Sequence, residues 1–188
     1  LPAVVFDPGF DLDSWIDVIC DVPSMFHRRA RGLVPAGGVP FRKMMERTTC
    51  EAPRMEDWEL HLSSVFTEVR SYAYIEVRSA DLLPDDVAFA VPSFWTGLLY
   101  DDDNLSAALD LGRPVDNRAA WRAAMDSAAK SGLDGEIGGR SIRDQVTALL
   151  EMVGAAYRAG RVPCGGSNRA ALSSLDALAL RHGIRFRP

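Results

Sequence analysis

Residues 72–81 read YAYIEVRSAD, and the alternation in this stretch decides how the middle of the chain is expected to fold. Tyr74, Glu76 and Arg78 occupy every second position, with apolar residues between them. Because successive side chains of a β-strand point to opposite faces, one face carries the charges and the other is apolar. This period predicts a half-buried strand. The charged face fits either an exposed sheet edge or a strand that lines a site for metal and phosphate, and the pattern alone leaves both open.

The whole chain has the composition of a globular protein that can bury a core. Its 188 residues are 47% hydrophobic and 25% charged, which is ordinary for a single domain. The formal net charge of -5 argues against nonspecific nucleic-acid binding, which needs a basic surface. We therefore expect no nucleic-acid partner. Nearly all of the 21 basic residues are arginines, whose planar donors suit local phosphate or carboxylate binding.

The cysteines and the apolar runs bear on the compartment. The three cysteines, Cys20, Cys50 and Cys164, form neither a CxxC pair nor an even disulfide framework, which favours a reducing environment. No apolar run approaches a membrane span, and the opening LPAVVFDPGF lacks the regions of a signal peptide. We expect a cytoplasmic protein with no membrane partner. Because the chain begins with Leu1 rather than Met, we also expect it to be a piece of a longer protein or a trimmed chain.

Local patterns predict short strands in the first part of the chain and helices in the last third. Strands are expected over AVVF near the beginning and over 72–81, and helices over 11–20, 41–47, 55–66, 85–103, 116–130, 141–158 and 168–182. Pro92 lies inside one of these segments and should kink or divide its helix. Residues 135–139, GEIGG, lack the Lys-Ser/Thr of a P-loop and follow no predicted strand, so we expect a flexible connector.

Several blocks of this sequence, in the same order, resemble the C-terminal half of glutamate–cysteine ligases of the plant and proteobacterial type. The blocks are EDWELHLSSVFTEVR (56–70), YIEVRSAD (74–81) and VPSFWTGLLYDD (91–102). The earlier segments LPAVVFDPGF and DVPSMF also look like the family's LPFVF and DVPMYF. The likeness therefore extends over nearly the whole chain.

This resemblance implies a fold and an activity. The fold would be α+β, the C-terminal portion of a glutamine synthetase-like fold, with short strands followed by a helical C-terminal region. Residues 1–110 would be the strand-containing part of the catalytic domain, and residues 111–188 the helical region of the same domain. The implied reaction joins the γ-carboxylate of glutamate to the amine of cysteine through a γ-glutamyl phosphate, with ATP as co-substrate and Mg²⁺ as cofactor. It is the first step of glutathione biosynthesis.

The resemblance also implies roles for four side chains. Glu76 matches the family's strand glutamate and would be a ligand of Mg²⁺, which prefers hard oxygen donors. Arg78, about 6.6 Å along the same face of an extended strand, would be the catalytic cation for the γ-phosphate or the acyl phosphate. Arg70 and His61 match family positions and would bind ATP or substrate, or else brace the strand. A lone histidine on a helix more often has a structural role.

The sequence departs from the family pattern in ways that leave parts of this interpretation open. Val18 replaces a common tyrosine, and residues 24–29 read SMFHRR where the family has MYFVYR, which leaves the acceptor amine undecided. Cys50 lies near a regulatory cysteine of the plant enzymes, but Ala36 stands at its expected partner position. We therefore expect no plant-like disulfide switch.

The resemblance implies that the other metal-binding carboxylates of the family lie in an N-terminal half, which we expect this chain to lack. We therefore expect such a half to be a partner, and expect exposed strand edges and apolar surface where it would pack. Two alternatives stay open. One is a related carboxylate–amine ligase with another acceptor or pathway, such as ergothioneine synthesis or specialised metabolism. The other is a noncatalytic remnant used as a binding or regulatory module, against which the retained pair of Glu76 and Arg78 argues.

Overall fold

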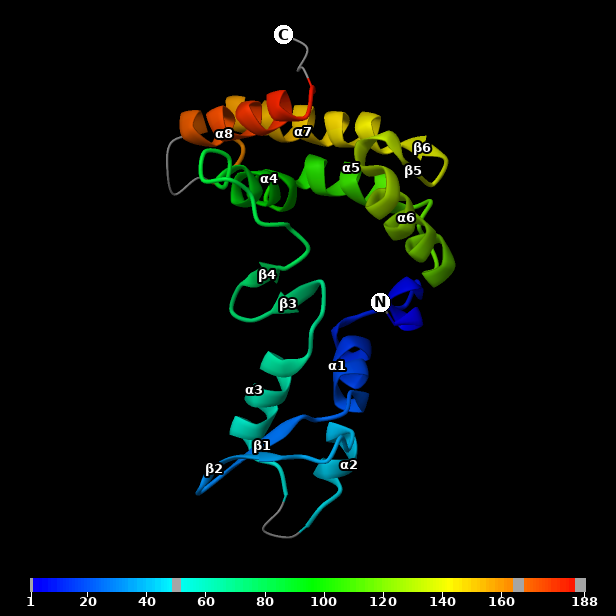
Figure 1. The fold of residues 1–188 in the computed structure, drawn as a ribbon, viewed down its shortest axis with the longest axis vertical. Helices are drawn as coiled ribbons and strands as arrows, with labels where there is room; N and C mark the ends of the chain where they lie inside the picture. Colours follow the sequence, from blue (N-terminus) through cyan, green and yellow to red (C-terminus); the bar gives the residue numbers. More distant parts are fainter. Residues whose placement is uncertain (1, 49–51, 164–167, 185–188) are drawn as a thin grey trace. The chain divides into compact units, whose positions relative to one another are not determined.

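The computed structural model describes residues 2–48, 52–163 and 168–184 (Figure 1). The chain divides into two compact units, Leu1–Ser79 and Ala80–Pro188. The secondary structure is mixed α and β and mostly helical, and in the described residues the strands form three antiparallel pairs. This confirms an α+β chain with short strands and a helical later part. The predicted division of a ligase domain at 110/111 stays a prediction.

The first unit contains three helices, a short 3₁₀ helix and two strand pairs among its described residues. They are η1 (Ala3–Phe6), α1 (Leu12–Asp21), β1 (Phe26–Arg29), β2 (Gly32–Pro35), α2 (Phe41–Met45), α3 (Met55–Ser64), β3 (Val69–Ser71) and β4 (Ile75–Val77). The helices expected in this unit are confirmed. The strand expected over AVVF is wrong, because these residues close a local 3₁₀ turn instead, with the N–H of Asp7 donating to the carbonyl of Val4 at 3.0 Å.

Asp57 fastens the β1–β2 hairpin to α3. Its side chain is 1% exposed and accepts hydrogen bonds from the backbone N–H groups of Arg54 (3.0 Å) and Arg28 (2.5 Å). The guanidinium of Arg29 adds an ion pair at 3.2 Å. Burial raises the pKa of Asp57, but these donors outweigh burial and hold the pKa below its usual range. A buried carboxylate with three donors therefore sets the position of the hairpin on the helix.

The second unit is a helical assembly with one small hairpin in its described part. Its elements are α4 (Ala90–Leu99), α5 (Asp102–Gly112), α6 (Arg118–Ser131), η2 (Gly132–Asp134), β5 (Glu136–Ile137), β6 (Arg140–Ser141), α7 (Ile142–Arg158) and α8 (Asn168–Arg181). The helices expected over 116–130, 141–158 and 168–182 are confirmed. Asn117 and Ser141 cap the first two, and Gly183 follows the third with a φ of 69°.

Two expectations in this unit are wrong. The helix expected over 85–103 is two helices, and α4 begins only at Ala90. Pro92 therefore lies in the first turn of α4, where a missing N–H breaks no helical hydrogen bond and causes no kink. The segment GEIGG is not a flexible connector. Gly138 and Gly139 take φ values of 60° and 71° and form the two-residue turn between β5 and β6, which needs positive φ at both positions.

The core of the second unit lies among α4, α7 and α8. Its buried side chains include Leu98, Leu150, Val153, Tyr157 and Leu175. Gly97 permits the close approach of α4 to α7, because a Cβ atom there would lie 2.5 Å from Cγ1 of Val153. The helical part therefore has a continuous apolar core of its own.

A buried carboxylate also joins the start of α5 to the segment that follows α7. The side chain of Asp101 is 4% exposed, caps α5 through the N–H of Asn104 at 3.0 Å, and pairs with Nε of Arg161 at 2.6 Å. The hydrogen bond from Arg161, followed by that from the backbone of Asn104, holds the pKa of Asp101 below its usual range.

We expect this carboxylate to make the stability of the second unit depend on pH. A carboxylate with a lowered folded pKa stabilises the fold above its unfolded pKa of about 3.9, and this contribution is lost as pH falls through the folded value. Asp101→Asn keeps the cap but removes the charge, so its urea midpoint should lie below that of the wild type at pH 7. The two midpoints should converge below about pH 3.9. A difference that persists unchanged in acid would contradict this assignment.

Candidate functional site

The predicted charged strand forms a short antiparallel hairpin with β3. Val69 pairs with Val77, Arg70 with Glu76, and Ser71 with Ile75. The N–H of Arg78 adds a further bond to the carbonyl of Glu68 at 2.9 Å. The strand is shorter than the expected 72–81, since Tyr72 and Tyr74 belong to the turn, where the N–H of Tyr72 donates to the carbonyl of Tyr74 at 2.8 Å.

The hairpin brings three of the four predicted site residues together. The carboxylate of Glu76 lies 3.3 Å from Nη1 of Arg70 and 3.8 Å from Nε of Arg78. Arg70 comes from the facing strand, directly opposite Glu76 in the register. One carboxylate between two guanidinium groups leaves a net positive charge of one, so the cluster favours an anionic ligand over a bare cation.

The environment of this cluster combines burial with access. The side chains of Arg70, Glu76 and Arg78 are 14%, 37% and 28% exposed. The guanidinium of Arg78 lies over the ring of Phe66 at 5.1 Å, and Nη1 of Arg70 donates to the hydroxyl of Tyr72 at 3.0 Å. The contacts of Phe66 and Tyr72 were not predicted, because neither residue carries a charge or a spacing that marks it. Both hold an arginine in place.

The apolar face of the strand is not buried within the first unit. Ile75 is 61% exposed and Val69 is 48% exposed. The β3–β4 sheet has two strands, so each strand has an outer edge with no strand beside it among the described residues. Exposed apolar strand faces and open edges are typical of surfaces that another segment covers. The predicted apolar surface is therefore present on this hairpin.

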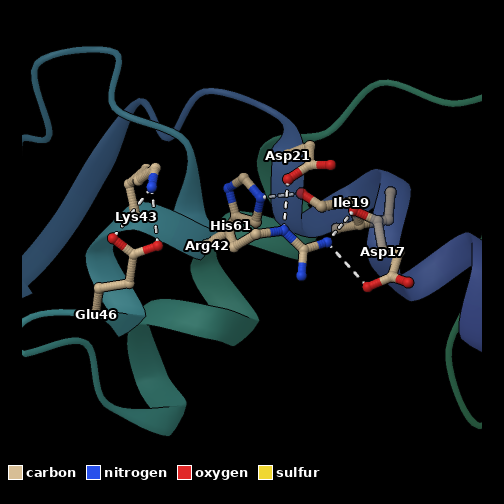
Figure 2. Close-up of polar contacts among 7 residues, drawn as sticks. All are labelled: Asp17, Ile19, Asp21, Arg42, Lys43, Glu46 and His61. Carbon is tan, nitrogen blue, oxygen red and sulfur yellow. Dashed lines mark hydrogen bonds and ion pairs between the residues drawn. The ribbon is translucent and has the colours of Figure 1, made fainter.

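His61 lies on α3, inside the first unit, and its side chain points toward Ile19 (Figure 2). It is 1% exposed and stacks on Phe41 with ring centroids 4.9 Å apart. Its Nε2 lies 2.8 Å from the carbonyl of Ile19. Because a carbonyl only accepts, Nε2 carries the hydrogen, and Nδ1 accepts from the hydroxyl of Ser24 at 3.3 Å. These contacts brace α3 against the end of α1. A direct role of His61 in ATP or substrate binding stays a prediction.

An exposed arginine clamp joins α1 and α2 and was not predicted (Figure 2). Nε of Arg42 lies 2.6 Å from Asp21, and Nη2 lies 2.9 Å from the carboxylate of Asp17. Hydrogen bonds to Asp21 and then Asp17 raise the pKa of Arg42 above its usual value. The spacing of the two acids at i and i+4 on a helix was the available signal. The clamp is a helix-to-helix brace.

The comparisons with known proteins decide the family. The family profile described as glutamate-cysteine ligase family 2 (GCS2) matches residues 1–184. The chain belongs to the glutamate-cysteine ligase family 2.

Plant members of this family include proteins similar to part of the chain. The chloroplastic glutamate–cysteine ligase of Arabidopsis thaliana is 42% identical over 111 residues, which cover 57% of this chain and 21% of the relative. Those of Brassica juncea and Solanum lycopersicum are 41% and 39% identical over the same length, covering 22% and 21% of the relatives. The matched residues therefore span about a fifth of the length of these ligases.

In this family member the hairpin offers one carboxylate to a metal. No group of three or more His, Cys, Asp or Glu side chains within 2–48, 52–163 and 168–184 is arranged to hold a metal ion. Glu76 supplies a partly exposed hard oxygen donor, which suits Mg²⁺ as one ligand among several. Further carboxylates would have to come from another segment.

Further observations concern the cysteines and membrane crossing. Cys20 is a buried free thiol, and burial raises its pKa. Ala36 lies in the small core with Phe41 and Met44. The predictions that involve Cys50 and Cys164 lie outside the described residues.

None of the described helices has the length and apolar character that a membrane crossing requires.

Proposed function

We propose that this chain is part of an ATP-dependent glutamate–cysteine ligase that forms γ-glutamylcysteine, the first product of glutathione biosynthesis. The observation that carries this proposal is the cluster on the β3–β4 hairpin. In a member of the glutamate-cysteine ligase family, Glu76 lies within 4 Å of both Arg70 and Arg78 and remains partly exposed. An acid and two guanidinium groups on one hairpin suit the binding of a metal and its phosphate together.

Arg70 and Arg78 would have different roles in the proposed reaction. In the proposed reaction an oxygen of the glutamate γ-carboxylate attacks the γ-phosphorus of ATP, and ADP leaves. The cysteine amine then attacks the acyl carbon, and phosphate leaves with that oxygen. Arg78 would stabilise the negative charge on the transferring phosphoryl group, and Arg70 would hold substrate and orient Glu76.

The cluster could supply Mg²⁺ with part of its coordination shell. Glu76 would be one of its ligands, and the bound ion would supply charge neutralisation on the phosphates. Because Arg70 and Arg78 already neutralise the Glu76 carboxylate, the acid would have to turn from one of them toward the ion. Within the described residues, the hairpin would therefore supply one ligand to the ion.

We propose that the remaining ligands come from an N-terminal half of the same enzyme, as a separate polypeptide or as a preceding segment. The matched region spans 21% of the Arabidopsis relative, which leaves most of a ligase to be supplied. The open edges and exposed apolar residues of β3 and β4 would join the missing strands, completing a glutamine synthetase-like sheet. We place the assembly in the cytoplasm, in line with the free thiol of Cys20.

A second candidate is a related ligase with a different amine acceptor. Val18 stands where the family commonly has a tyrosine, and it lines a cavity with Met25, which is 51% exposed. A tyrosine at position 18 would place a phenol in this cavity, which would reduce its volume and add a polar hydroxyl to its wall. The loss of that group favours an altered acceptor over altered phosphoryl transfer.

The test is ADP release with Mg-ATP, glutamate and cysteine. The purified chain is assayed alone and after mixing with the complementary portion of the Arabidopsis thaliana relative. We expect ADP release only in the mixture, and dependence on cysteine rather than on other amines. Release with a different amine would favour the second candidate. If neither sample releases ADP although the chain is folded, the result would contradict the proposal and favour a noncatalytic module.

A further inference from the structure

A groove of about 800 Å³ lies along α8 in the second unit. α7 and α8 lie side by side, and one face of α8 packs into the core described above (Figure 1). The other face of α8 forms one wall of the groove. The opposite wall comes from Tyr157 and Arg158 at the end of α7 and from Gly160 just after it. The groove therefore leaves the outer face of α8 open to solvent.

The open face of α8 carries apolar side chains. Leu180, near the end of the helix, is 66% exposed and lines the groove together with Leu172 and Ala177. The other end of the groove is open space, since a Cβ atom at Gly160 would meet no heavy atom within 4 Å. An exposed leucine at one end and an unfilled hollow at the other are typical of a surface that another helix covers.

The charges along the groove are separated by sign. Arg158 and Arg169 lie where α7 ends and α8 begins, since Nδ2 of Asn168 donates to the carbonyl of Tyr157 at 3.1 Å. Asp176 lies on the same face of α8 as Arg169, because the seven residues between them make almost two turns of about 3.6 residues each. Neither Arg158 nor Asp176 has an ion pair among the described residues. One end of the groove is therefore positive and the other negative.

This order of charges selects the occupant. We propose that the groove binds the α8 helix of a second copy of the chain, in antiparallel orientation, about a two-fold axis that passes between Leu172 and Ser173. In a two-fold contact, each pair of residues occurs twice. Asp176 of each copy would then meet Arg169 of the other copy. A parallel pairing would instead place like charges beside each other.

The same register accounts for the apolar ends of the groove. Leu180 of each copy would extend past the beginning of α8 in the other copy, into the hollow beside Gly160. Arg158 of the other copy would lie near Asp176 and add to its positive surroundings. The leucine, the hollow and the separated charges are therefore all used by one contact.

This inference goes beyond the proposed ligase activity and does not depend on it. All the residues of the groove belong to the second unit, whereas Glu76 and Arg78 belong to the first. The contact requires no ATP, Mg²⁺ or N-terminal half, so the two proposals can fail separately.

The experiment is sedimentation equilibrium of the purified full chain at concentrations up to about 0.1 mM. We expect a monomer–dimer equilibrium. Arg169→Asp and Asp176→Arg each place like charges together at both ends of the contact and should weaken dimerisation at least about tenfold. The double variant restores both opposite pairs and should dimerise like the wild type. An equimolar mixture of the two single variants should form a heterodimer for the same reason.

Two further variants separate this contact from general effects of charge. Asp126→Arg makes the same change of charge at an exposed position of α6 and should leave dimerisation unchanged. Leu180→Ser removes the apolar contact without a change of charge and should weaken dimerisation about tenfold. Thermal unfolding of each variant shows whether the second unit stays folded.

Three results would overturn the proposal. A wild-type chain that stays monomeric over this range would leave the groove to another segment of the enzyme. A dimer that either single charge reversal leaves intact would form through a different surface. A dimer that both reversals weaken, and that neither the double variant nor the mixture restores, would show that these charges do not meet across a two-fold axis.

Discussion

Replacing Arg78 by alanine is expected to lower turnover of the assembled ligase by about 10²–10³-fold, the usual effect of losing one preorganised transition-state donor. The transferring phosphoryl group would develop its charge beside Arg78. Arg70, the other arginine of the described hairpin, lies closer to Glu76, at 3.3 Å against 3.8 Å for Arg78, and is therefore less available to replace it. Folding should change little. The side chain is 28% exposed, and its pairing with Glu76 at 3.8 Å is long.

The measurement is the rate of ADP release in the mixture, with thermal unfolding of each variant followed in parallel. Arg78→Lys should recover part of the rate, because it keeps the charge but not the planar fork. Arg113→Ala removes an exposed arginine of the second unit and should match the wild type. Turnover at the wild-type rate in Arg78→Ala would rule out this residue as the catalytic cation.

Replacing Asp57 by alanine is expected to destabilise the first unit by about 3 kcal/mol. The substitution leaves the N–H groups of Arg28 and Arg54 without their acceptor and removes the partner of Arg29. Because these bonds tie β1 to α3, the loss should appear locally before it appears elsewhere. Amide hydrogen exchange of β1, β2 and α3 should accelerate about 100-fold, since 1.4 kcal/mol corresponds to a factor of ten.

Asp21→Ala is the matched control. Asp21 also pairs with an arginine, at 2.6 Å, but its side chain is 64% exposed. Exposed ion pairs contribute about 0–1 kcal/mol, so exchange in this variant should stay near the wild-type rate. Similar acceleration in both variants would show that burial of Asp57 is not what makes its contacts stabilising.

The helices could be predicted where the sequence carries both a periodic apolar face and a cap. The helices predicted over 116–130 and 141–158 begin close to the residues that cap them in the structure, Asn117 and Ser141. The boundary between α4 and α5 was missed, because Asp101 was assigned to the end of one helix when its side chain caps the next. The β5–β6 hairpin was missed because its strands have two residues each, too few for a period to appear.

The candidate site could be predicted in part. Alternation placed Glu76 and Arg78 on one face, and the register added Arg70 across the hairpin. Pattern alone could not reveal which donors lack partners. The unpaired Nε of Arg70 and the buried contacts of His61 depend on segments distant in sequence, such as Ile19 and Ser24. Tertiary packing, rather than local spacing, decides those features.

The central claim is that this chain contributes its charged hairpin to a ligase that works through an acyl phosphate. The most direct measurement supplies glutamate with ¹⁸O in its γ-carboxylate to the mixture of this chain and the complementary portion of the Arabidopsis thaliana relative. The account predicts γ-glutamylcysteine and one ¹⁸O atom in each phosphate released, with the rate of formation of both products falling about 10²–10³-fold in Arg78→Ala. Phosphate without ¹⁸O, or the same labelled product in the absence of this chain, would contradict it.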